Sequence, residues 1–244
     1  VAMAMEDKLG VSANFAQVIT WLVILTIGWL IFQLAIPASK GALGKRKRGD
    51  AALILGQCGA GKTALFFRLR DEAEIQSVSS LKLSRDKLRI KALDTPAPID
   101  FIDYPGHLRM RGRASELLKE ARCIVYLVDS EDKPRLKDVA EHLYELFTNP
   151  DVLELHTPIL LALNKTDLSS ARTEKFIIDE IDREIEIMRN SRGATLEGQD
   201  SADSYLGIEG EKFKLLQHAP CPVQTCRISV KRPSLDPLHD FLRE

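Results

Sequence analysis

"GQCGAGKT", from Gly56 to Thr63, is the stretch that decides the fold. It fits the pattern G-x-x-x-x-G-K-[S/T], in which glycines let the backbone wrap around phosphate groups with its N–H groups pointing inward. An apolar strand pattern precedes it at 51–55 and a helical pattern follows at 63–70, as a phosphate-binding loop requires. The following residues are therefore expected to bind phosphate: Gly56, Gln57, Cys58, Gly59, Ala60, Gly61, Lys62, Thr63 and Ala64.

Two side chains of the loop and a second motif predict a site for Mg²⁺ and the terminal phosphate. The Lys62 ammonium is expected to reach the β- and γ-phosphates, and the Thr63 hydroxyl to bind Mg²⁺. The motif "DYPG" begins at Asp103, after the apolar run "IDFID". We expect Asp103 to hold the metal through a water, and the N–H of Gly106 to approach the γ-phosphate.

A third motif, "NKTD" from Asn164 to Asp167, predicts which base is bound. The Asp167 carboxylate can accept two hydrogen bonds, from N1–H and from the N2 amino group of guanine. Adenine has no such pair of donors, so the carboxylate would be left unpaired against ATP. Asn164 is expected to pair with the base edge, and the stem of Lys165 to lie over the face of the base.

Strand patterns alternate with helical patterns around these motifs. Strands are expected at 51–55, 88–93, 99–103, 123–129, 158–164 and 223–229, and helices at 63–70, 114–121, 135–147, 174–189 and 235–242. The second and third strands should form an antiparallel hairpin, and the last three should be covered on both faces. The pattern predicts an α/β fold with a mostly parallel six-stranded sheet and helices on both faces. One domain over 50–244 would hold it all, with an exposed insertion near 190–211.

Composition excludes some classes of protein. The 244 residues carry a formal net charge of −1, which argues against a generic nucleic-acid binder. The four cysteines form no disulfide framework, which indicates a reducing compartment. His218, Cys221 and Cys226 lack the second ligand pair of a zinc site.

The N-terminal part contains an uncharged stretch over 16–36, closed by Pro37. A helix of this length spans about 30 Å, the thickness of the hydrocarbon core of a bilayer. A buried core helix would have a polar face, and a cleaved signal peptide would be shorter with a basic start. We therefore expect a transmembrane helix at 16–37. The basic linker at 38–49 should lie on the cytosolic side, because positive residues stay there, and residues 1–15 on the lumenal side.

The motifs together resemble those of the Ras-like small GTPases. The loop is followed in order by D-x-P-G, N-K-x-D and a late Ser-x-Lys, which is "SVK" from Ser229 to Lys231 here. Within that superfamily the chain is most similar to the β subunits of the signal recognition particle receptor. This likeness rests on the N-terminal span and on "DYPGHLRMR", "ARCIVYLVDS" and "YLGIEGEKFKL". It implies that the N–H of Val230, beside Ser229, contacts the guanine O6.

The resemblance also implies a function. The chain would be a single-pass GTP-binding subunit, with GTP or GDP and Mg²⁺ as its ligands, that recruits the receptor α subunit to the endoplasmic reticulum membrane for co-translational targeting. Its partners would be the α subunit and the membrane, with the ribosome and translocon as further candidates, and without sequence-specific binding of nucleic acid. The alternatives are an Arf- or Sar-like trafficking GTPase and a GTP-binding scaffold without turnover.

Some positions depart from the Ras-like pattern. His107 stands where Ras relatives usually place the Gln that orients water, so it either orients water poorly, giving slow hydrolysis, or has no catalytic role. Cys58 replaces a Gly that is common in the loop. The family's first switch loop supplies a further hydroxyl to Mg²⁺, and the resemblance assigns this role to Ser79 in "IQSVSSLKLS", with Ser77 as the alternative. The basic stretch that begins at Gly106 is expected to bind the partner.

Overall fold

The structure of the chain is a computed structural model that describes residues 21, 26, 48–71, 83–90, 97–106, 116–196, 206–232 and 235–243, the last five residues of 116–196 by backbone alone. The chain divides into two units, Val1–Arg46 and Lys47–Glu244. Of the span expected at 16–37, only Trp21 and Thr26 are described, and both are helical. Within the described ranges, no helix is both long and apolar enough to cross a membrane.

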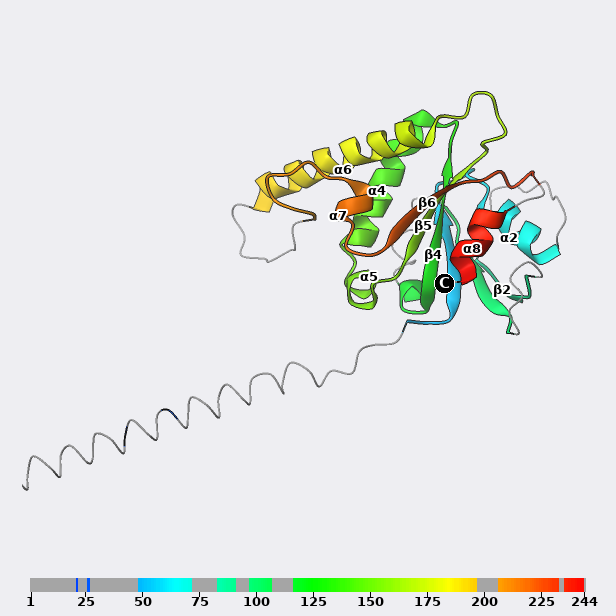
Figure 1. Cartoon of the computed structure of the whole chain (residues 1–244), viewed down its shortest axis with the longest axis horizontal. Helices are drawn as coiled ribbons and strands as arrows, with labels where there is room; N and C mark the ends of the chain where they lie inside the picture. The colour runs from blue at the N-terminus through cyan, green and yellow to red at the C-terminus, as the bar shows by residue number, and fades with distance from the viewer. Residues whose placement is uncertain are drawn as a thin grey trace, which may run out of the picture. The chain divides into compact units, whose positions relative to one another are not determined.

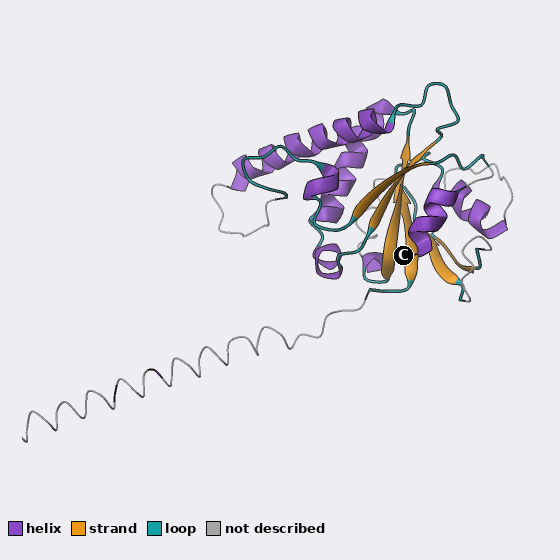
Figure 2. Cartoon of the chain, viewed as in Figure 1, coloured by secondary structure: helices purple, strands orange, loops and turns teal. Residues whose placement is uncertain are grey.

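The second unit contains one six-stranded sheet, with the strand order β2-β3-β1-β4-β5-β6 (Figure 2). All neighbouring strands are parallel except β2 and β3, which pair antiparallel. The expectation of a mostly parallel six-stranded sheet is therefore confirmed. The strands are β1 (Ala51–Gly56), β2 (Ser84–Leu88), β3 (Ile99–Asp103), β4 (Ala121–Asp129), β5 (Ile159–Asn164) and β6 (Val223–Arg227).

Helices cover both faces of the sheet, as the alternation predicts (Figure 1). Because side chains alternate along a strand, Leu53 and Leu55 of β1 pack on one face and Ile54 on the other. The first face carries α4 (Leu136–Phe147) and α6 (Glu174–Leu196). The second carries α2 (Lys62–Asp71) and α8 (Asp236–Arg243). The central strand is thus buried along its whole length, which explains its uninterrupted apolar sequence.

The edge strand β2 was misplaced by the sequence prediction. The antiparallel hairpin is confirmed, but its first strand ends at Leu88, where the prediction began it. The true strand, "SRDKL", is mostly polar and is exposed along most of its length. An ion pair joins its Arg85 to Asp100 of β3 at 2.5 Å. An edge strand is partly stabilised by such charged pairs, and it therefore lacks the apolar pattern used to find strands.

Three further expectations need correction. The last strand, β6, ends at Arg227 and is only partly buried, because it forms the other edge of the sheet. The helix expected at 114–121 ends at Leu118 in its described part, and Ala121 already belongs to β4. The segment near 190–211 is not simply an exposed insertion, because α6 continues to Leu196 and Leu206 is buried.

A buried arginine of α6 holds the last residues of that segment. Arg189 of α6 is only 3 % exposed, and its guanidinium donates to the carbonyl oxygens of Leu206, Ile208 and Glu211. Charge-assisted bonds of this kind fix irregular backbone that makes no sheet or helix contacts of its own. A short helix, α7 (Leu215–His218), follows and had no signal in the sequence long enough to detect.

The helix α5 (Pro150–Leu155) was missed, although the sequence marks its start. The side chain of Asn149 accepts hydrogen bonds from the backbone N–H groups of Asp151 and Val152, and Pro150 occupies the first helical position. At the other end, Arg48 donates to the carbonyl oxygens of Leu155 and His156. This basic linker residue therefore contacts the domain itself.

Candidate functional site

The predicted site residues gather at the carboxyl ends of the parallel strands, where ligands bind in sheets of this kind. The loop 56–61 follows β1, Asp103 ends β3, Asn164 ends β5, and Ser229 lies just beyond β6. Thr63 and Ala64 lie in the first turn of α2. The sheet thus brings together residues that are up to 173 positions apart in the sequence, from Gly56 to Ser229.

Glycine is required at two positions of the loop. Gly56 has a φ of 135°, and a Cβ there would lie 2.2 Å from the carbonyl oxygen of Leu127. Gly61 has a φ of 97°, and its Cβ would lie 2.5 Å from the Nδ2 atom of Asn164. Both φ values lie in the left-handed region, which L side chains rarely adopt. Between them, the buried Gln57 leaves both polar atoms of its side chain without a hydrogen bond.

The Lys62 ammonium lies across the loop. It donates to the carbonyl oxygen of Gln57 at 2.8 Å, and burial lowers its pKa, although the nearby Asp103 opposes that shift. A Cβ on Gly106 would lie 2.3 Å from this nitrogen, so the two segments approach closely only because Gly106 has no side chain. The loop and the "DYPG" segment therefore enclose one cationic centre.

Thr63 and Asp103 form the pair that the sequence assigned to a metal. The Thr63 hydroxyl donates to Oδ2 of Asp103 at 2.7 Å. Burial raises the pKa of Asp103, and the bond from Thr63 opposes that shift. The other carboxylate oxygen, Oδ1, is buried without a hydrogen bond.

These two oxygen ligands fit Mg²⁺, which prefers hard oxygen donors and usually takes only one or two from protein. No group of three or more His, Cys, Asp or Glu residues suited to a metal occurs in the described part of the chain. The remaining ligands of a Mg²⁺ held here would accordingly be water and phosphate oxygens.

Asn164 makes two contacts within the protein that the sequence did not predict. Its amide donates to the carbonyl oxygen of Ala60 at 2.7 Å and accepts from the N–H of Val230 at 3.0 Å. Both ends of the amide are therefore used within the protein, and the side chain joins the phosphate loop to the loop after β6. One N–H of the Asn164 amide remains beyond these two bonds, and the contacts of Asn164 and Val230 with a base stay predictions.

Asp167 is half-buried, with an exposed side of the kind that base recognition needs. The Ser229 hydroxyl donates to its Oδ1 atom at 2.6 Å and lowers the pKa of Asp167. The carboxylate is thus held ionised and oriented as an acceptor. The role of Ser229 here, positioning Asp167, was not part of the sequence prediction.

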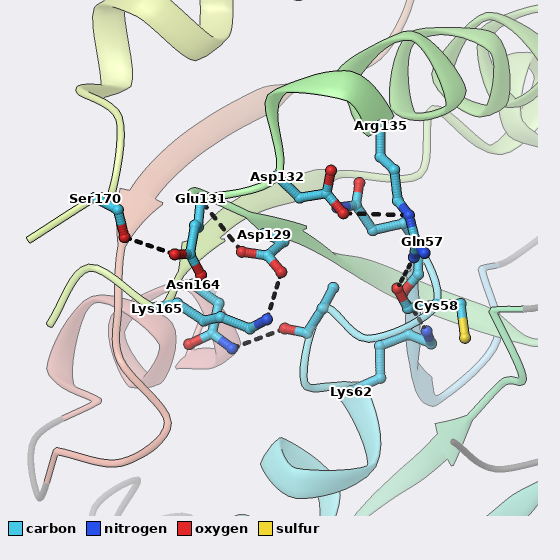
Figure 3. A network of polar contacts seen from close by, with 11 residues as sticks. Gln57, Cys58, Lys62, Asp129, Glu131, Asp132, Arg135, Asn164, Lys165 and Ser170 are labelled. Atoms are coloured by element: carbon cyan, nitrogen blue, oxygen red, sulfur yellow. Dashed lines mark hydrogen bonds and ion pairs between the residues drawn. The ribbon is translucent and has the colours of Figure 1, made fainter. Parts of the chain in front are cut away.

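Lys165 is fixed from the side of β4. Its ammonium forms an ion pair with Asp129, and its backbone has a φ of 64°. Figure 3 shows the network around it: Asp129 also accepts from the N–H of Glu131 at 3.1 Å, and the Glu131 carboxylate accepts from Ser170 at 2.7 Å. The ion pair fixes the charged end of Lys165. Its methylene stem is then available to contact the flat face of a ligand.

Arg135 was missed by the sequence analysis. It belongs to the 3-10 helix η3 (Lys133–Arg135), and its guanidinium donates to the carbonyl oxygen of Cys58 at 2.6 Å (Figure 3). Its Nε atom pairs with Asp132 at 3.2 Å. The two bonded residues are 77 positions apart, and no spacing rule connects them.

Ser77 and Ser79, and residues 107–115 of the expected partner surface, which include His107, Leu108 and Met110, lie outside the described residues. Their assigned roles stay predictions.

Comparison with known proteins agrees with the geometry of the site. A family model described as "Signal recognition particle receptor beta subunit" matches residues 47–219. The chain is 33% identical to the human signal recognition particle receptor subunit beta over 77% of its own length and 70% of that protein. It is 31% identical to the subunit of Dictyostelium discoideum over 74% of its length, and it spans 63% of that relative.

Solved structures give the same result. The mammalian SRP receptor matches 79% of this chain and 98% of the solved chain, with a TM-score of 0.69 and 28% identity. A chain from the "Signal recognition particle receptor SRb-GTP/SRX complex" of Chaetomium thermophilum matches with a TM-score of 0.61, 79% and 97% coverage, and 18% identity, which shows the fold alone. The protein has the α/β GTPase fold, and it belongs to the family of signal recognition particle receptor β subunits.

Proposed function

We propose that this chain binds GTP and GDP with Mg²⁺ at the carboxyl edge of its sheet. The observation that carries the proposal is the convergence of three features at one edge: the glycine loop with Lys62, the Thr63–Asp103 pair, and the oriented carboxylate of Asp167. Each of these features recognises a different part of one ligand.

Different residues would bind the phosphates, the Mg²⁺ ion and the base. Backbone N–H groups of the loop and the Lys62 ammonium attract the phosphates. Thr63 and Asp103 would hold Mg²⁺, which offsets phosphate charge when bound. Asp167 selects guanine, because its ionised oxygens accept from the two donors that adenine lacks. His107 remains the proposed residue for orienting water in slow hydrolysis, and phosphate release in a single turnover separates this role from a scaffold without turnover.

Nucleotide selection tests the proposal directly. GTP and GDP are expected to bind in the presence of Mg²⁺, and ATP at least about 30-fold more weakly, since an acceptor left unpaired against the bound base costs about 1–3 kcal/mol at each of two atoms. Equilibrium titration with fluorescent nucleotides, competed with unlabelled GTP or ATP, measures the ratio. Equal competition by ATP would overturn the assignment of Asp167.

We also propose that the chain is a single-pass protein of the endoplasmic reticulum membrane. Residues 1–15 would be lumenal, 16–37 would span the bilayer, 38–49 would link, and 50–244 would form the cytosolic GTPase domain. The support is the uncharged stretch at 16–36 and the basic residues after it, together with membership of a receptor family.

In its GTP form the domain would recruit the receptor α subunit for co-translational targeting, with the ribosome and translocon as candidate partners. The Chaetomium thermophilum structure is that of a complex between its receptor subunit and SRX. We assign the α-subunit contact to the stretch after Gly106, with Leu108 and Met110 as its apolar contacts, because a residue that senses the γ-phosphate can transmit the nucleotide state to a partner. A peripheral Arf- or Sar-like protein is the alternative.

Alkaline carbonate extraction separates the anchored from the peripheral protein. We expect the chain to stay in the membrane pellet, because a spanning helix is held by apolar burial and not by charge. A glycosylation acceptor inserted before residue 16 should be modified, and one inserted after Gly49 should not. Release into the supernatant, or the reverse pattern of modification, would contradict the proposed anchor.

Arg135 is expected to slow nucleotide release. Its bond to the Cys58 carbonyl fixes one peptide of the phosphate loop, so Arg135→Ala should raise the dissociation rate of GDP about fivefold to tenfold, for a bond of ~1–1.4 kcal/mol. Stopped-flow release of a fluorescent GDP measures the rate.

The matched control for this variant is Lys137→Ala, because Lys137 is exposed on α4, carries the same charge and lacks the contact. The affinity for guanosine, which has no phosphate, separates positioning of the loop from general damage to the fold. A lower guanosine affinity in Arg135→Ala would argue for general damage.

A further inference from the structure

A cleft lies at the amino ends of the parallel strands, on the opposite side of the sheet from the nucleotide loop. Its volume is about 760 Å³. It is lined by the residues that begin β1, β3 and β4, by two side chains of β2, and by the end of α8. Because β1, β3 and β4 are parallel, their amino ends share one edge, and their carboxyl ends carry the nucleotide site. The cleft is therefore independent of that site.

Basic side chains outnumber acidic ones in its lining. The basic residues are Arg85, Lys87, Lys119, Arg122 and Arg243, and the acidic ones are Asp50, Asp100 and Glu120. The resulting excess is two positive charges. Such an excess favours an anionic ligand, because a concave surface concentrates the field of its charges.

Among the described residues, ion pairs involve two of the five basic residues of the lining, Arg85 and Arg243, and two of its three acidic ones. Arg85 bonds to both Asp100 and Glu120, at 2.5 and 2.9 Å, so these two acids are occupied. Arg243 pairs with Asp240, which lies outside the lining. In the described part of the chain, neither Lys87 nor Lys119 forms an ion pair. With Arg122, they form a group that we call the basic cluster.

The basic cluster has the composition of a phosphate site. Arg122 donates from Nη2 to the carbonyl oxygen of Leu242 at 2.6 Å, which fixes its guanidinium at the wall of the cleft. A positioned guanidinium presents several N–H donors in one plane, and lysines add mobile positive charges. Phosphate oxygens accept hydrogen bonds from both kinds of group. Ala97 and Pro98, which are exposed, add apolar surface to the same lining.

The course of the chain indicates the source of the phosphate. Gly49, Asp50 and Ala51 form part of the lining, so the chain enters the domain at the cleft. Only 13 residues, 37–49, separate this entry from the uncharged stretch at 16–36, and they can span at most about 45 Å. If that stretch crosses a bilayer, lipid head groups lie within reach of the cleft.

We propose that this cleft binds the phosphate of an anionic phospholipid head group, and so fixes the GTPase domain against the membrane that holds its anchor. The inference rests on the proposed anchoring, and it is separate from nucleotide binding. The ligand is a phosphate monoester at the end of a glycerol backbone. Lys87, Lys119 and Arg122 neutralise it, and the apolar residues of the cleft contact the glycerol.

The test uses the full chain in nanodiscs of phosphatidylcholine, with or without a minority of phosphatidic acid. Hydrogen exchange in peptides over 49–51, 84–88 and 119–122 is expected to slow about threefold or more when phosphatidic acid is present, because bound head groups stabilise the local structure. The double variant Lys87→Gln/Lys119→Gln should lose this protection. The matched control Lys175→Gln/Lys212→Gln, which removes two exposed lysines elsewhere, should keep it.

Two further arms examine a soluble phosphate and the nucleotide site. Glycerol 3-phosphate added to nanodiscs of pure phosphatidylcholine should give little protection; equal protection would make the ligand a soluble phosphate and overturn the lipid assignment. GTP titration of the same samples measures the affinity of the nucleotide site independently of the cleft. Loss of the chain from the discs would refute the anchor and with it this inference, and protection that survives in the double variant would refute the cleft.

Discussion

Replacing Asp167 with Asn is expected to lower the affinity for GTP by about 100-fold, because hydrogen bonds to a charged group contribute about 1.5–3 kcal/mol each. The carboxylate is ionised and fixed by Ser229 at 2.6 Å, so both oxygens are presented as acceptors. An amide presents one acceptor and two donors, and it therefore opposes one guanine donor with a donor of its own.

The same substitution should increase affinity for xanthine nucleotides, whose C2 carbonyl accepts from the new amide. Titration of the unmodified protein and of Asp167→Asn with GTP and with xanthosine triphosphate measures the affinity of each protein for each nucleotide. Asp179→Asn, on the exposed surface of α6, is the control for the loss of one negative charge. If Asp167→Asn keeps its preference for GTP, Asp167 does not read the base.

Gly56→Ala is expected to give the largest loss of stability of any single methyl addition in the loop. The new Cβ would lie 2.2 Å from the carbonyl oxygen of Leu127 in the central strand β4, at a φ of 135° that alanine rarely adopts. Backbone strain and overpacking each cost about 1–3 kcal/mol, so the free energy of unfolding should fall by about 3 kcal/mol or more.

Gly59→Ala is the matched comparison, because Gly59 has a φ of 82° and open space within 4 Å of its Cβ position. Strain alone should then lower the free energy of unfolding by about 1 kcal/mol. Urea unfolding of the nucleotide-free protein, followed by circular dichroism, measures both values. Losses of equal size in the two variants would show that β4 yields to the added methyl group.

The buried strands and the three motifs could be predicted because each of their positions requires a particular kind of residue. The run "AALIL" is apolar on both faces because β1 lies in the middle of the sheet, and Gly56 and Gly61 are glycines because their φ values require it. The order of motifs also placed Thr63 beside Asp103 correctly, since the first turn of α2 follows the loop at the carboxyl end of β1, and Asp103 ends the neighbouring parallel strand β3.

The remaining errors come from contacts between distant side chains. The edge strand β2 is stabilised by Arg85 and Asp100, which have no apolar alternation, and Arg135 reaches Cys58 across 77 positions. The contacts of Asn164 with Ala60 and Val230, which belong to other loops, were likewise not expected from the sequence. Local pattern carries no information about such pairings.

The two hydrogen bonds of Asn164 restrict which residue can stand there. One end of the side chain must donate, to the Ala60 carbonyl, and the other must accept, from the Val230 N–H. A carboxylate of the same shape would turn an oxygen toward that carbonyl, and an apolar isostere would leave both backbone groups buried without a partner. Glutamine has the right chemistry but one methylene too many for a site where Gly61 leaves no spare volume. Asparagine therefore satisfies both backbone groups of this junction, and its isosteres aspartate and leucine do not.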